Sequence, residues 1–138
     1  MSAEENLLCG SCLCGDVRYT VSGTPRAFYH CHCSRCRKVS GTGHASNLFV
    51  AGALHWVSGE ELLRRYQLPN AERFGNNFCT VCGSRLPIFL ESRELVYIPA
   101  GSLDEEPQYQ PQARIFQGSR ASWSCDSSEL PQFDAYPG

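Results

Sequence analysis

The chain has 138 residues, of which 42% are hydrophobic and 19% charged, and its formal net charge is −2. This length fits one domain over residues 1–138 with a modest core. The nearly balanced charge argues against a general nucleic-acid binder or a protein held at a membrane surface. The polar start of the chain and the short apolar runs predict no secretory signal and no transmembrane segment, so we expect a cytoplasmic protein.

Apolar and polar residues alternate along most of the chain, which predicts a mainly β fold with little helix. In chain order, the expected strands cover residues 17–21, 27–30, 44–50, 54–57, 73–78, 86–90, 95–98 and 113–116. Residues 23–25 should separate the first two strands, and residues 51–53 should separate the next two. Residues 91–94 should close a hairpin.

The remaining segments predict little regular structure. Residues 34–40 fit one helical turn that ends at Gly41. Residues 60–68 fit a helix or a strand about equally well. The tail from residue 124 should be irregular, with Trp123 and Phe133 as its apolar anchors.

Seven of the nine cysteines fall into three clusters. The clusters are Cys12 and Cys14; Cys31, Cys33 and Cys36; and Cys79 and Cys82. In a reducing compartment, clustered cysteines bind metal or carry out redox chemistry more often than they form disulfides, and an odd number cannot pair completely. Seven thiolates are three more than one tetrahedral zinc requires. The count therefore predicts one closed structural zinc and one open zinc.

Each two-cysteine cluster offers half of a tetrahedral site. Cys79 and Cys82 flank a tight turn followed by Gly83, while Cys12 and Cys14 lie on one face of an extended segment. Two alternatives stay open, because spacing does not decide which halves pair. Each cluster could be a separate redox dithiol, or Cys9 could pair with Cys12 in place of Cys14. Cys125 shows no sign of a partner.

The middle cluster differs because Cys31, Cys33 and Cys36 can converge on one ion from a single short segment. Zinc with three thiolates leaves a fourth position for water or for a substrate thiol, which the metal holds deprotonated. The alternatives are a structural site closed by a protein ligand such as His44, or a site left empty. His32 should point away from the metal and serve packing or support, and His30 and His55 carry no signal beyond core or surface.

Cationic residues surround this cluster. Arg35, Arg37 and Lys38 could attract the carboxylates of an anionic substrate, with Ser34 as a further donor. The competing interpretation is that they compensate thiolate charge.

These motifs together resemble the glutathione-dependent formaldehyde-activating (GFA) enzymes. The resemblance covers roughly residues 10–135. It rests on residues 10–15, 31–38 with Gly41, 78–83, 115–116 up to Trp123, and 130–133.

The resemblance implies a small zinc-held fold of antiparallel sheets, called a β-tent. It also implies a structural zinc at Cys12, Cys14, Cys79 and Cys82, and a labile zinc at Cys31, Cys33 and Cys36. The implied activity is that of a carbon–sulfur lyase acting in reverse, in which glutathione adds to formaldehyde and gives S-hydroxymethylglutathione. The chain has Arg114 where many members of the family have a histidine, so a proton-transfer role is not carried over to that position.

The preferred hypothesis is a zinc-dependent enzyme of carbon–sulfur lyase type that acts on a small thiol adduct. Glutathione would be its co-substrate, Cys31, Cys33 and Cys36 its catalytic site, and Arg35, Arg37 and Lys38 its binding residues. The second hypothesis is a non-catalytic zinc-held module that binds or chaperones another protein, and the third is a thiol redox sensor. The three-cysteine cluster favours the first, while the lack of an attacking and resolving pair disfavours the third.

Overall fold

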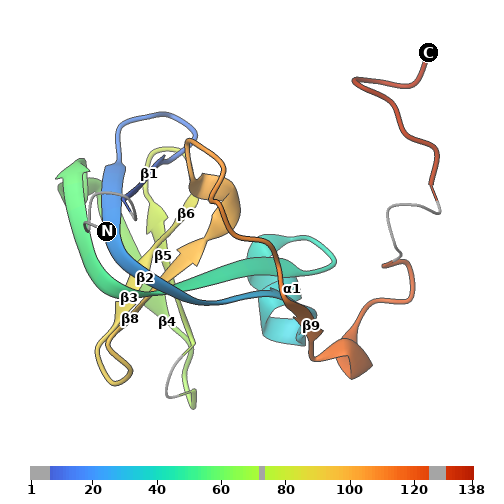
Figure 1. Ribbon diagram of the computed structural model, residues 1–138, viewed down its shortest axis with the longest axis horizontal. Helices are drawn as coiled ribbons and strands as arrows, with labels where there is room; N and C mark the ends of the chain where they lie inside the picture. The colour runs from blue at the N-terminus through green and yellow to red at the C-terminus, as the bar shows by residue number, and fades with distance from the viewer. Residues whose placement is uncertain (1–6, 72–73, 125–129) are drawn as a thin grey trace.

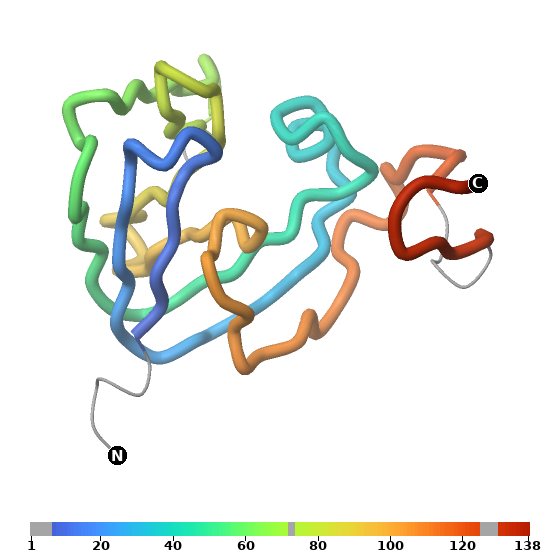
Figure 2. The backbone as a smooth tube through the Cα atoms, turned by 90° about the horizontal axis from the view of Figure 1, so that it is seen from above, coloured from blue at the N-terminus to red at the C-terminus, as the bar shows by residue number. Residues whose placement is uncertain are grey.

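The longest feature of the fold is a pair of antiparallel strands, β2 (Arg18–Cys31) and β3 (Ala45–Ser58). The computed structural model describes residues 7–71, 74–124 and 130–138. In Figures 1 and 2, β2 and β3 run together from the body of the protein to the end where helix α1 lies. The breaks predicted at residues 23–25 and 51–53 were wrong, because Gly23 and Gly52 face each other within the β2–β3 pairing, and only a local register shift follows, between Pro25 and Ala27.

Two sheets build the body of the described chain. The larger has the order β1-β2-β3-β8-β7, with β9 beside β2, and the smaller has the order β4-β5-β6. Their pairings are antiparallel apart from that of β9 with β2, which is parallel. The remaining strands are β1 (Leu8–Ser11), β4 (Leu63–Gln67), β5 (Gly75–Cys79), β6 (Arg85–Leu86), β7 (Ile88–Leu90), β8 (Leu95–Pro99) and β9 (Ala113–Ile115).

The strand expected over residues 86–90 is split at Pro87. β6 before it belongs to the smaller sheet, and β7 after it belongs to the larger one and forms the predicted hairpin with β8. Proline has no N–H to donate to a strand ladder, so the chain passes from one sheet to the other here. Residues 60–68 resolve into the 3₁₀ turn η2 (Glu60–Leu62) and β4. The strand predicted over 73–78 is found as β5; residue 73 lies outside the described residues.

The predicted helical turn is confirmed as α1 (Ser34–Ser40), which ends at Gly41 with a left-handed φ of 72°. The other helical pieces in the described residues are the 3₁₀ turns η3 (Ala100–Ser102) and η4 (Gln117–Ser119). The prediction of a mainly β fold with antiparallel sheets and little helix is thus confirmed. Within the described ranges, no helix has both the length and the apolar character needed to cross a membrane.

The main hydrophobic core contains two of the cysteines. Cys12 and Cys79 are 5% and 0% exposed, and both pack in this core. The other fully or nearly buried members of this core are Val17, Tyr19, Val21, Phe28, Leu48, Val50, Leu86, Val96 and Ile98. By contrast, Phe133 is 57% exposed, so the prediction that it anchors the tail was wrong. Trp123 is 65% exposed and does not join this core, but it lines a cavity with residues of α1.

Candidate metal centres and the adjoining cavity

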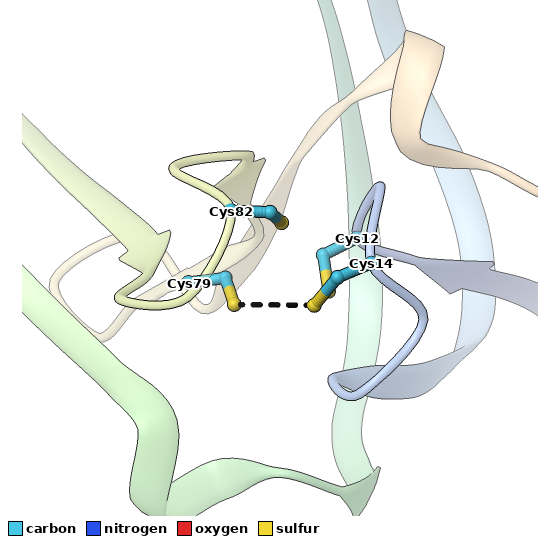
Figure 3. A group of neighbouring side chains, drawn as sticks. All are labelled: Cys12, Cys14, Cys79 and Cys82. Carbon is cyan, nitrogen blue, oxygen red and sulfur yellow. Dashed lines mark hydrogen bonds between the residues drawn. The ribbon is translucent and has the colours of Figure 1, made fainter.

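Two turns from distant parts of the chain bring four cysteines together. Cys12 and Cys14 follow β1, while Cys79 ends β5 and Cys82 lies in the turn after it. Gly83 closes that turn with a φ of 80°, and its N–H donates to the Cys79 carbonyl at 2.8 Å. The side chains of the two pairs point toward each other (Figure 3), and the four sulfur atoms all lie within 4.8 Å of one another.

The spacing of these sulfur atoms fits a tetrahedral zinc. Zn–S bonds of about 2.3 Å place the sulfurs of a tetrahedral site about 3.8 Å apart. The Sγ atoms of Cys12 and Cys14 are 3.5 Å apart, and those of Cys14 and Cys79 are 3.9 Å apart. Backbone N–H groups of Val17 and Val81 donate to Cys12 and Cys79 Sγ at 3.3 and 3.4 Å and hold these two sulfurs in place. The four-cysteine group thus has the size and donors of a structural zinc site.

Ser84 supports this group from the side. Its hydroxyl lies 3.2 Å from Cys82 Sγ and accepts the N–H of Leu13 at 2.9 Å, so it links the two turns. The Ser84 hydroxyl, followed by the Cys14 backbone, lowers the pKa of Cys82 to about 5. Thiolate is the form of cysteine that binds metal, so this position is prepared for ligation.

The alternative pairing through Cys9 is not the one that the fold assembles. Cys9 lies in β1, where its carbonyl accepts the N–H of Asp104 at 2.9 Å, and its sulfur belongs to neither group of candidate ligands found in the described residues. The described cysteines are free thiols, and Cys125 lies outside the described residues.

The three remaining cysteines form a second group where β2 meets α1. Cys31 ends β2, Cys33 caps the helix and Cys36 lies in its first turn, with the three sulfurs within 4.8 Å of one another. The Cys36 N–H donates to Cys33 Sγ at 3.3 Å. The His32 N–H donates to the Ile115 carbonyl at 2.9 Å, which fastens this segment to β9. No fourth ligand atom of the described residues completes the group, so the three sulfurs fit a metal that keeps one exchangeable position.

The surroundings of these three thiols shift their pKa values in different directions. Burial raises the pKa values of Cys31 and Cys36. Burial acts in the same direction on Cys33, but hydrogen bonds from the Cys36 backbone and from the neighbouring thiols outweigh it and lower its pKa. Cys33 is therefore the sulfur of this cluster that loses its proton most readily.

Histidines pack beside the three-cysteine group without joining it. The rings of His30 and His44 stack at 4.0 Å between centroids, and His32 and His44 lie 5.2 Å apart. His32 is 1% exposed, in agreement with a packing role, and His55 is exposed. Burial, followed by the charges of His44 and Arg114, lowers the pKa values of both His30 and His32, so both favour the neutral form. His44, the suggested closing ligand, is absent from the ligand group within the described residues.

A cavity of about 450 Å³ opens between the two sheets and reaches Cys36. Its volume lies in the range of small-molecule sites. Its walls are formed by residues of β3, β4, β5, β6, β7 and β8 and of the β7–β8 turn. They include aromatic and cationic side chains. The lining residues that matter below are Cys36, Asn47, Arg65, Phe74, Arg85 and Tyr97.

Sequence reasoning missed Asn47, Arg85 and Tyr97 as site residues. One signal was available, because Asn47 directly precedes the apolar run Leu48 to Val50 in β3. The structure shows that Asn47 is buried, with 7% of its surface exposed. For Arg85 and Tyr97 the position follows only from the way the two sheets pack.

The cationic residues of α1 face elsewhere. Arg37 and Lys38 line a separate cavity of about 370 Å³ with Trp123, and Arg37 Nη1 donates to the Ser119 carbonyl at 3.2 Å. Arg35 is exposed on α1 and lines neither this cavity nor the one at Cys36.

The fold and its two cysteine groups define a small β-sheet protein with the ligand sets of metal centres. The family described as "Glutathione-dependent formaldehyde-activating enzyme" matches residues 7–119, and the chain belongs to this GFA family. A protein of Halomonas elongata named "Putative glutathione-dependent formaldehyde-activating enzyme" is 34% identical over 145 aligned residues, which cover 95% of this chain and 89% of that protein. A crystal structure of a Rhodobacter sphaeroides protein shares the fold, with a TM-score of 0.58, 24% identity and coverage of 78% of this chain and 99% of that one.

The two groups should release zinc in a fixed order. We expect the freshly purified protein to carry between one and two zinc ions, and a mild chelator to remove the ion at the three-cysteine group first. Three thiolates with an exchangeable position hold the metal less securely than four thiolates partly buried in the core. Zinc release should be followed with a colorimetric indicator while circular dichroism monitors the fold. Release of all zinc in one step, together with unfolding, would contradict this order.

Proposed function

We propose that this protein is a zinc-dependent enzyme of carbon–sulfur lyase type that joins glutathione to formaldehyde and forms S-hydroxymethylglutathione. Family membership and the name of the Halomonas elongata relative support the proposal. The observation that carries it is a three-cysteine group, separate from the complete four-cysteine group, that opens through Cys36 into a cavity. The free thiols of the described cysteines suit a reducing, cytoplasmic setting.

In this proposal, the sulfur of glutathione reacts at the metal site formed by Cys31, Cys33 and Cys36, beside the cavity that Cys36 lines. Zinc bound there would hold the incoming thiol as thiolate at neutral pH. A carbon–sulfur bond forms between that sulfur and the carbonyl carbon, the C=O π pair moves to oxygen, and the proton lost by the thiol ends on this oxygen. The chain's part is to hold both reactants in one orientation, with Cys33 fixed by the Cys36 N–H.

We also propose that Arg35, Arg37 and Lys38 bind the carboxylates of glutathione. Their charge and their places on α1, next to Cys33 and Cys36, support this role. The cavity that Arg37 and Lys38 share with Trp123 offers a surface for the peptide part of the ligand.

Titration with glutathione tests the sulfur site. The zinc-loaded protein should bind glutathione and should bind S-methylglutathione, which has no ionisable thiol, far more weakly. Cys33→Ser should lose glutathione binding while its circular dichroism spectrum stays native, because Cys33 lies outside the main core. Cys9→Ser is the matched control: it removes a thiol that belongs to neither group, so binding should be unchanged.

Formaldehyde consumption then tests the reaction. The rate with protein and glutathione should exceed the spontaneous rate, measured in parallel because the reaction proceeds unaided in water. Binding without acceleration would leave a thiol-binding site whose carbonyl substrate is another compound. Absence of both thiol binding and acceleration would favour a non-catalytic zinc-held module.

A further inference from the structure

Three buried polar atoms of the cavity next to Cys36 have no hydrogen-bond partner among the residues that the structure describes. They are Asn47 Oδ1, Arg85 Nε and the Tyr97 hydroxyl. Asn47 and Tyr97 are 7% and 6% exposed. A buried polar atom left without a partner is costly, so three such atoms in one cavity indicate a ligand that satisfies them.

The larger sheet places two of these side chains, Asn47 and Tyr97, on one face, and Asn47 lies next to Cys36. Asn47 is paired with Pro99 and Phe49 with Tyr97 in the β3–β8 ladder, so Asn47 and Tyr97 point to the same face of the sheet. Asn47 Nδ2 lies 3.8 Å from Cys36 Sγ, and its other amide atom, Oδ1, is left for a ligand.

Arg85 is held in place by its neighbours. Its guanidinium lies over the Tyr97 ring at 4.8 Å and over the Phe74 ring at 5.7 Å, and Nη2 donates to the Gly75 carbonyl at 3.3 Å. Among the described residues, no carboxylate forms an ion pair with it. The buried Tyr97 hydroxyl has a raised pKa, mainly through desolvation, and so keeps the proton that it can donate.

The three atoms match the hydrogen-bonding capacity of one hydroxyl group. Tyr97 O–H and Arg85 Nε–H donate and Asn47 Oδ1 accepts, while a hydroxyl oxygen accepts two hydrogen bonds and donates one. Building on the function proposed above, we propose that Asn47, Arg85 and Tyr97 bind the hydroxymethyl oxygen of the S-hydroxymethylglutathione adduct. In adduct formation the same two donors meet the oxygen as it gains negative charge, which makes them catalytic residues of oxyanion-binding type.

A pair of ligands that differ by one hydroxyl tests this assignment by binding alone. S-hydroxymethylglutathione and S-methylglutathione should be titrated into the zinc-loaded protein under the same excess of formaldehyde, which keeps the adduct formed. We expect the wild-type protein to bind the hydroxymethyl compound about tenfold more tightly, because the methyl compound leaves the three atoms without partners. Tyr97→Phe should reduce this ratio to about twofold or less.

Two further variants make the outcome decisive. Asn47→Ala removes the hydrogen-bond acceptor and should lower the same affinity ratio. This test remains valid if Tyr97→Phe does not fold. Tyr29→Phe is the matched control, since Tyr29 does not line the cavity, and it should leave the ratio unchanged.

An equal affinity of the wild-type protein for the two ligands, or an undiminished preference in both cavity variants, would overturn the assignment. The proposed function would then still be judged by glutathione binding and formaldehyde consumption, which do not depend on this ratio. Failure to bind either thioether would also overturn the assignment.

Discussion

Replacement of Cys79 by serine should abolish the folded state under ordinary buffer conditions. Cys79 is fully buried, belongs to the main hydrophobic core and stands in the four-cysteine group that joins the turn after β5 to the turn after β1. Binding of structural zinc contributes on the order of 10 kcal/mol to folding. This is comparable with the whole net stability of a domain of this kind, about 5–15 kcal/mol. Circular dichroism and zinc content measured on the purified variant would show the loss.

Cys36→Ser is the matched control for this variant. Cys36 is also buried, at 5% exposure, but it lies in the small cluster around Cys31 and Ala45, outside the main core. This variant should stay folded and keep one zinc while it loses the second. Equal loss of structure in the two variants would contradict the division into a structural and an exchangeable site.

The sequence identified the candidate cysteine ligands but not which cysteine pairs share a site. Cys79, Cys82 and Gly83 predict a metal-binding turn by themselves, since the chemistry of the turn is local. Which second pair completes the site depends on how β1 and β5 are placed, and the same spacing allowed Cys9 as a partner. The structure brings Cys12 and Cys14 to Cys79 and Cys82, as the family resemblance implied.

The cavity was harder to foresee because its walls come from both sheets. Arg85 and Tyr97 belong to different sheets, and their contact at 4.8 Å depends on the passage of the chain between sheets at Pro87. No local pattern encodes such a contact. The sequence predicts one strand over residues 86–90, because the alternation of apolar and polar residues indicates side-chain direction only. It carries no information about which sheet a strand joins.

Glycines caused the other error in the predicted strands. Gly23 and Gly52 were interpreted as breaks because glycine often marks turns. In the structure they face each other in the β2–β3 pairing, where the two backbones approach closely. Gly23 has a φ of 142°, a conformation that other residues rarely adopt. Glycine inside a strand indicates a close backbone approach as readily as an end of the strand.

Replacement of Gly52 by alanine should therefore destabilise the fold strongly. The added Cβ would overlap the carbonyl oxygen of Ser22 and lie 2.7 Å from Gly23 Cα, and both atoms belong to the backbone of the facing strand. Neither atom can move without opening the β2–β3 pairing that carries the chain from the core to the three-cysteine group. We expect a loss of about 3 kcal/mol in the free energy of unfolding, as for severe overpacking. This corresponds to a fall in melting temperature on the order of 10 °C.

Gly101→Ala is the control for this prediction, because a Cβ at that position meets no atom within 4 Å. Its free energy of unfolding, measured by urea titration, should stay within about 0.5 kcal/mol of the wild-type value. If Gly52→Ala were equally harmless, the facing strands would have to be able to separate locally at little cost. The fold would then not require glycine at position 52.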